Sequence, residues 1–156
     1  MNVDEHARNI GGLICNLQAV EFDIRCVLAW ANYPEASGMP PDHKLADFAV
    51  GNEYVAGAFT NYDSLKQLLS AFNALAEHRF LKKLPAGLVE LRDALARGRC
   101  VADPGDSYFR LIKFSAVRNG RVTVAYNEIL DPDWYSRQRR ILSDALWVLE
   151  DARQQP

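Results

Sequence analysis

Apolar side chains recur every three or four residues between positions 10 and 31, and no other feature restricts the fold more strongly. This spacing places them on one face of an α-helix, whereas a strand would scatter them over both of its faces. Asp4 is suited to cap the helix, and Pro34 would stop it because proline cannot continue the hydrogen-bond ladder. The pattern predicts one long helix from about residue 4 to Tyr33. Its apolar face consists of Ile10, Leu13, Ile14, Leu17, Ile24, Val27, Leu28 and Ala31.

A second apolar stripe predicts another helix, which starts at the capping residue Asp63 and ends near Arg79 or Phe80. Residues 34–61 are mostly a connection. Within it, the stretch 47–62 is compatible with an extended segment or with a short helix, and the sequence does not decide between them. The stripe consists of Leu65, Leu68, Leu69, Phe72, Leu75 and Ala76.

A third stripe predicts a shorter helix with Pro85 in its first turn, a position that proline favours. This helix should end directly after Arg97, because Gly98 can adopt the left-handed conformation that commonly follows the last helical turn. The apolar residues of this stripe are Leu84, Leu88, Leu91 and Leu95.

The dipeptide Asn119-Gly120 lies between two β-prone runs and predicts a hairpin, since both residues tolerate the positive φ of a tight turn. Asp131 or Asp133, with Pro132, should start a final helix. We predict a mainly α fold, a bundle of four to five helices with one β-hairpin inserted before the last helix. The hairpin's apolar face, expected to pack on a helix, is Ile112, Phe114, Val122, Val124 and Tyr126.

Composition places the chain among ordinary globular proteins. It has 156 residues, of which 49% are hydrophobic and 24% charged, and we predict one domain over residues 1–156. No stretch reaches the ~20 apolar residues of a membrane span, and the first residues are polar where a secretory signal would be apolar. The three cysteines form no paired motif, so we expect a cytoplasmic protein with reduced thiols and no membrane partner.

Charge is unevenly distributed along the chain, although the net charge is only −2. Residues 1–78 hold ten acidic and four basic side chains, whereas residues 79–99 hold six basic and two acidic ones. The basic segment, with Lys82, Lys83 and Arg99, is therefore a candidate for RNA phosphates. It is equally compatible with a solvated helix face that pairs with the acidic half of the chain.

The same basic segment contains the stretch LRDALARGR, residues 91–99, which resembles the motif of HEPN domains. In that family an arginine near a helix end is followed, four to six residues later, by a histidine. Many members read approximately LRDALAHGR at this place. Arg92 matches the arginine, Asp93 matches the polar residue that often follows it, and Arg97 occupies the position of the histidine.

The resemblance implies a helical bundle that descends from a metal-independent ribonuclease acting as a homodimer, with no cofactor and no metal. It assigns Arg92, Asp93 and Arg97 to a degenerate catalytic motif. Histidine can act as a general base near neutral pH, whereas arginine stays protonated but binds phosphate well. We therefore expect RNA or phosphate binding with lost cleavage, in an inactivated toxin or defence ribonuclease whose Arg97 evolved or was introduced. Regulation through an antitoxin or another protein partner fits this interpretation.

Two alternatives remain open at this point. Arg92 and Arg97 are five positions apart, which corresponds to ~140° of net rotation on a helix, so one RNA strand can meet both only where a second copy contributes. The motif helix could then be the seam of a non-enzymatic, dimeric interaction module, in which both arginines are ordinary exposed cations near a helix end. Alternatively, His78 could supply the base of an active ribonuclease. The three histidines are too far apart in sequence to predict a metal site.

Overall fold

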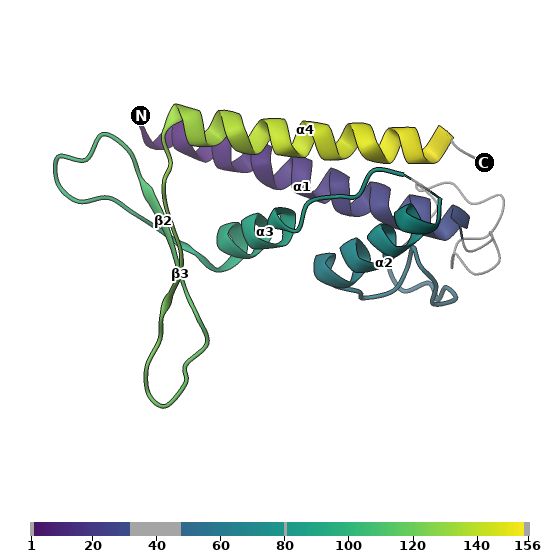
Figure 1. Ribbon diagram of the computed structural model, residues 1–156. Helices are drawn as coiled ribbons and strands as arrows, with labels where there is room; N and C mark the ends of the chain where they lie inside the picture. The colour runs from purple at the N-terminus through teal and green to yellow at the C-terminus, as the bar shows by residue number, and fades with distance from the viewer. Residues whose placement is uncertain (1, 32–47, 80, 155–156) are drawn as a thin grey trace. The chain divides into compact units, whose positions relative to one another are not determined.

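The structure, a computed structural model, describes residues 2–31, 48–79 and 81–154. Within these residues the chain forms four helices and one three-stranded sheet (Figure 1). This confirms a mainly helical fold, whereas the HEPN-like arrangement of the helices stays a prediction. The elements are, in chain order, α1 (Val3–Ala31), α2 (Leu65–His78), α3 (Gly87–Arg97), β1 (Arg99–Val101), β2 (Arg110–Phe114), β3 (Val124–Ile129) and α4 (Pro132–Gln154).

Contacts divide the chain into two compact units, to which α1 and α4 each contribute a part. The motif unit comprises Met1–Gln18 and Pro85–Asp144, and the second unit comprises Ala19–Leu84 and Ala145–Pro156. A single domain over the whole chain stays a prediction. The predicted stop of the first helix at Pro34 lies outside the described residues, as does the alternative end of the second helix at Phe80.

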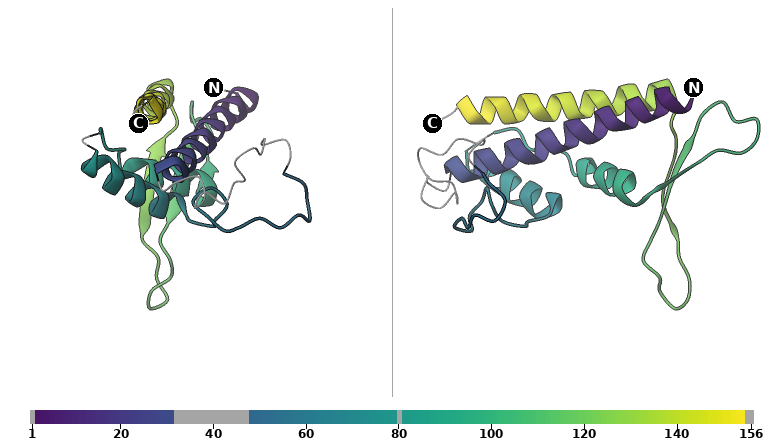
Figure 2. Two further views of the ribbon diagram at one scale, coloured as in Figure 1. Left: turned by 90° about the vertical axis from the view of Figure 1, so that its right-hand side faces the viewer. Right: turned by 180° about the vertical axis from the view of Figure 1, so that it is seen from behind.

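In the motif unit, the first turns of α1 and α4 lie side by side (Figures 1 and 2). The Tyr135 hydroxyl lies 2.9 Å from His6 Nδ1, and Arg139 donates a hydrogen bond to the Asn9 side chain. Apolar residues from every element of the unit except the outer strands form its core. The core residues are Leu13, Leu17, Leu88, Leu91, Ala94, Leu111, Leu130, Trp134, Tyr135 and Leu142.

Side chains cap the N-termini of α4 and α2. Of the two predicted caps of α4, Asp131 is the one used, because its Oδ1 accepts a hydrogen bond from the Trp134 N–H at 2.7 Å. For α2 the prediction of Asp63 as the cap is wrong by one residue. Ser64 is the cap, and it forms a reciprocal capping box with Gln67, which satisfies two backbone N–H groups at once.

The predicted turn at Asn119-Gly120 is present, with φ values of 51° and 72° as a two-residue hairpin turn requires. The prediction of a single hairpin is nevertheless incomplete, because a third strand pairs with it. The sheet is antiparallel in the order β1-β2-β3, and β1 pairs Arg99 with Ile112. A three-residue strand that follows a helix directly is too short to leave a periodic signal in the sequence.

The predicted buried face of the hairpin is also wrong. Leu111 is the strand residue that is buried, at 1% exposure, and it packs on the side opposite to Ile112 and Phe114. Phe114 remains 40% exposed. One face of the sheet therefore joins the helices through Leu111, and the other face carries apolar side chains at the surface.

Gly98 ends α3 by a different mechanism from the one predicted. Its φ is −75° and its ψ 167°, so the chain leaves the helix in an extended and not a left-handed conformation. Glycine is required for space instead, since a Cβ at this position would collide with the Ala94 carbonyl oxygen and lie 2.6 Å from Leu111 Cδ1. The turn from α3 into β1 therefore depends on close packing between helix and sheet.

In the second unit, Arg25 fixes the segment before α2. It donates hydrogen bonds to the backbone carbonyl and the side chain of Asn61, at 3.0 and 2.8 Å, and to the Asp63 carbonyl at 2.8 Å. Residues 48–62, the described part of the stretch whose conformation the sequence left open, contain no helix or strand. No helix among the described residues combines the length and the apolar character that crossing a membrane requires.

Candidate nucleic-acid interface

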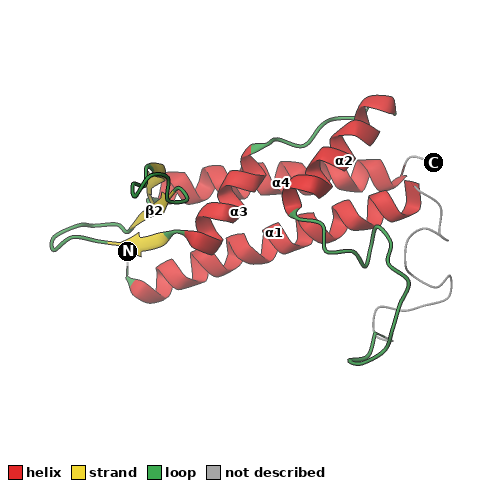
Figure 3. Ribbon diagram, turned by 90° about the horizontal axis from the view of Figure 1, so that it is seen from below, coloured by secondary structure: helices red, strands yellow, loops and turns green. Residues whose placement is uncertain are grey.

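Helix α3 carries the motif residues on the side away from its buried face. It packs against β2 within the motif unit, and Figure 3 shows the yellow strands beside its end. Its buried residues are Leu88, Leu91 and Ala94. The spacing predicts Leu95 in the core, but Ala94 is buried instead and Leu95 is only half-buried. Arg92 and Arg97 are both exposed to solvent, as a phosphate-binding role requires.

Asp93 is shared between two cations. Its Oδ1 lies 3.4 Å from Arg92 Nη1, and its Oδ2 lies 3.9 Å from Lys113 Nζ on β2. Both contacts are loose and partly exposed, with 44% of the Arg92 side chain accessible, so each contributes little to stability. Arg92 can therefore exchange this carboxylate for the phosphate of a ligand at small cost.

Arg97 is the last residue of α3. Its side chain is exposed and makes no hydrogen bond or ion pair with any residue that the structure describes. A cation is favourable at this end of a helix because the last carbonyl groups carry partial negative charge. The position thus holds an unpaired guanidinium, whose planar fork of N–H groups suits phosphate oxygens.

Arg99 lies two residues further on, in β1. Its guanidinium carbon is 5.5 Å from the centre of the Phe114 ring, over the ring face. Stacking of this kind fixes the guanidinium while its edge N–H groups stay accessible. The predicted residues Arg92, Asp93, Arg97 and Arg99 thus belong to one unit and follow one another from helix to sheet.

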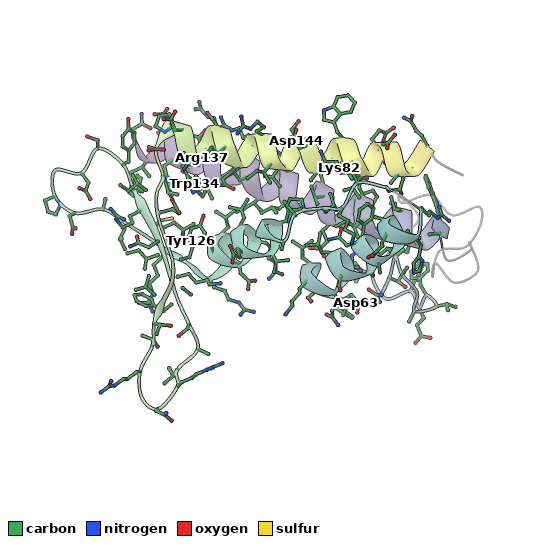
Figure 4. All side chains as sticks on the ribbon, viewed as in Figure 1. Asp63, Lys82, Tyr126, Trp134, Arg137 and Asp144 are labelled. Atoms are coloured by element: carbon green, nitrogen blue, oxygen red, sulfur yellow. The ribbon has the colours of Figure 1, made fainter. Side chains whose placement is uncertain are left out.

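Lys82 and Lys83, the other two predicted RNA-binding residues, belong to the second unit. Lys83 is paired with Glu77 at 2.9 Å, and this hydrogen bond lowers the pKa of the Glu77 carboxyl. Lys82 is exposed (Figure 4). Their contribution to an RNA surface stays a prediction, because only the arginine set is gathered within the motif unit.

His6 is a titratable residue of the motif unit to which sequence reasoning gave no role. Its ring stacks on Phe109, with centroids 4.3 Å apart, and its Nδ1 meets the Tyr135 hydroxyl. Burial lowers the pKa of His6. Burial likewise raises the pKa of Tyr135 to about 12, with the nearby Cys100 thiol acting in the same direction and Arg139 opposing it. Because His6 and Tyr135 are 129 positions apart, no local pattern could have paired them.

The His6 contact predicts a pH dependence of folding. The folded state has the lower histidine pKa, so the unfolded state binds the proton first as the pH falls below the ordinary value of 6.5. The free energy of unfolding should therefore have its full value above this pH and decrease below it. Urea unfolding between neutral pH and about pH 5 measures the effect. His6→Phe should flatten this part of the profile, whereas His78→Phe, at an exposed helix end, should leave it unchanged. An identical profile for the parent and His6→Phe would contradict the prediction.

Trp134 connects α4 with the sheet of the motif unit, next to Tyr126 of β3 (Figure 4). Burial raises the pKa of the Tyr126 phenol, and the neighbouring Trp134 N–H acts in the opposite direction. The Trp134 Nε1–H is buried without a partner of good hydrogen-bond geometry among the described residues. The indole therefore contributes by packing, and it holds β3 next to α4.

Among the described residues, no three His, Cys, Asp or Glu side chains lie together in a way that could hold a metal ion. Comparisons with protein-family models, with curated proteins and with solved structures find no match to this chain. Interpretation of the interface therefore depends on its own residues and on the motif that they form.

Proposed function

We propose that this chain is an RNA-binding domain of HEPN-like type whose ribonuclease motif is impaired at Arg97, so that it holds RNA without cutting it. The observation that supports this most directly is the state of Arg97. It is an exposed guanidinium at the end of α3, unpaired within the described part of the chain, and Arg92 and Arg99 lie in the same unit. These three arginines attract a polyanion such as RNA more strongly than the net charge of the chain does.

The chemistry of RNA cleavage explains why binding and cutting separate at this position. Metal-independent cleavage needs a base that removes the proton of the ribose 2′-OH and a cation that stabilises the charge developing on phosphorus. Arginine side chains stay protonated at neutral pH and have no acceptor, so Arg97 cannot be the base. Arg92 can still be the cation. The motif keeps the parts that hold a phosphate and lacks the part that starts the reaction.

A homodimer belongs to this proposal. Arg92 and Arg97 are separated by ~140° around α3, so one RNA strand can contact an Arg92 and an Arg97 only where the α3 of a second copy approaches. A regulatory protein or an antitoxin that covers the same arginines is the other partner that this surface fits. The exposed apolar side chains on the sheet favour a different candidate, a dimeric interaction module without a nucleic-acid role.

RNA binding should depend steeply on salt, because each phosphate contact releases counterions. For single strands, the slope of log K against log salt falls by about 0.7 for each cationic side chain that no longer meets a phosphate. The double variant Arg92→Ala with Arg97→Ala should therefore bind more weakly at low salt and have a slope that is smaller by about 1.4. Fluorescence anisotropy with a labelled RNA strand at several salt concentrations measures both effects.

Lys66→Ala is the matched control, since Lys66 is an exposed cation on α2 that makes no ion pair within the described residues. It should leave the slope unchanged. If the parent binds no RNA at low salt, the proposal is wrong and the interaction module becomes the better account. A decrease of about 0.7 for Lys66→Ala, the same per charge removed as in the double variant, would mean that binding follows total charge and not the motif.

A further inference from the structure

One face of the three-stranded sheet exposes most of its side chains to solvent. We call it the outer sheet face. Its arginines and exposed apolar residues are Arg99, Val101, Arg110, Phe114, Val124 and Ile129, and the half-buried Ile112 lies on the same side. The register puts Arg99, Val101, Arg110 and Ile129 on one side, because β1 and β2 pair Val101 with Arg110 and β2 and β3 pair Arg110 with Ile129. Phe114 and Val124 pair beyond an irregularity between Lys113 and Phe114, and Arg99 lies over the Phe114 ring. Leu111 lies on the opposite side and is buried. Val101, Val124 and Ile129 are 43%, 57% and 45% exposed.

The charges of this face have one sign. Arg99 and Arg110 are its charged strand residues, and Arg118 and Arg121 pair with each other across the hairpin end that continues it. Glu128, the acidic residue of β3, pairs with Leu111 and therefore lies on the other side of the sheet. The outer sheet face thus combines apolar side chains with arginines, and its strands place no carboxylate there.

Two of its arginines are already held in position. Arg99 stacks over the Phe114 ring, and Arg110 Nη1 donates a hydrogen bond to Asn127 Oδ1 at 2.9 Å. Each keeps further N–H groups for a ligand. A planar ring placed on Phe114 or on either guanidinium gains stacking energy, and the phosphates on both sides of it meet positive charge.

A hollow of about 170 Å³ lies at the end of this face, between the β1–β2 loop and β3. It is lined by Asp106, Ser107, Tyr108, Arg110 and Ile129. The acidic member, Asp106, already accepts a hydrogen bond from the Asp103 N–H at 3.0 Å, which closes the turn. The hollow therefore offers an aromatic side chain and a guanidinium to a ring of small size.

We propose that the outer sheet face binds the unpaired nucleotides of a single-stranded RNA. This rests on the proposed function and specifies its ligand. Bases of a single strand can be splayed onto aromatic side chains, whereas those of an A-form duplex are stacked inside it. A second copy of the chain would cover the apolar side chains, but it would also bring the arginines of the two faces close together. Single-stranded RNA supplies both rings and negative charge.

Phe114→Leu tests the stacking contact while it keeps an apolar side chain on the strand. It should weaken binding of a short single-stranded RNA about 5- to 150-fold, the range for removing one aromatic ring on which a base stacks. Binding of the same sequence as a duplex should not change. Phe114→Tyr should restore single-strand affinity because it restores the ring. Trp147→Leu, which removes a 72% exposed aromatic side chain from α4, should have no effect.

Four results would overturn the inference, and they separate it from the function on which it rests. If the parent binds RNA but Phe114→Leu binds equally well, or if duplex and single strand bind alike, the sheet is not the contact and the proposed function stands. If the parent binds no RNA, both fail. If the parent is a dimer that Phe114→Leu dissociates, the face is a protein interface. Sedimentation of both proteins identifies this last case.

Discussion

An Arg97→His variant is expected to cleave RNA about 100- to 10,000-fold faster than the parent chain, without a metal ion. The substitution replaces a permanent cation with an imidazole, which is largely neutral near pH 7 and can act as a general base. A rate increase of this size is what a positioned general base contributes. Arg92 is already exposed on the same helix, and in the proposed function it is the cation that the reaction needs. Gel analysis of a labelled RNA strand in the presence of a chelator measures the cleavage rate.

The pH profile and two further variants show whether the gain comes from a base. The rate should rise as the new imidazole loses its proton, around the ordinary histidine pKa of ~6.5. Arg97→Gln removes the charge without adding a base, so it should stay inactive. Combining Arg97→His with Arg92→Ala should abolish the activity. An Arg97→His protein that binds RNA as tightly as the parent and leaves it intact would show that position 97 does not face the ribose.

Gly98→Ala should destabilise the protein by about 2–3 kcal/mol, the upper part of the range for forcing an extra carbon into a packed site. The new Cβ would meet the Ala94 carbonyl oxygen and Leu111 Cδ1, so α3 and β2 would have to separate. For a chain of this length the expected decrease in Tm is about 4–10 °C. Thermal unfolding followed by circular dichroism measures it.

Gly12→Ala is the matched control for this prediction. Gly12 lies inside α1 in the same unit, and a Cβ there would meet nothing within 4 Å. It should be neutral or stabilise the protein by up to about 1 kcal/mol, because alanine is the better helix former. Equal Tm values for Gly98→Ala and the parent would mean that the α3–β1 turn is not closely packed.

The parts of the fold that the sequence predicts are those that local spacing determines. The long apolar stripe of α1 and the turn at Asn119-Gly120 need no distant partner to be recognised. The predictions that failed depend on tertiary contacts. Gly98 is needed because Leu111 packs against it, and Leu111 replaces Ile112 as the buried strand residue because the sheet turns its other face to α3. The side of a strand that is buried is decided by its neighbours.

The candidate site likewise has residues that the sequence could predict and contacts that it could not. Arg92 and Arg97 could be selected from the motif alone, since both follow from one short helix and its end. The Asp93 contact with Lys113 and the stacking of Arg99 on Phe114 join residues from different elements, so the sequence could not reveal them. The outer sheet face was missed because two of its residues, Phe114 and Val124, were expected in the core.

Incubation of the parent protein with single-stranded RNA, in a chelator and at low salt, tests the central claim most directly. Binding and strand integrity are followed in the same samples. The account predicts a complex that forms, weakens steeply with salt and returns the RNA at full length. Metal-independent scission by the parent chain that disappears in Arg92→Ala would contradict it, because a working base would then exist beside a functional motif.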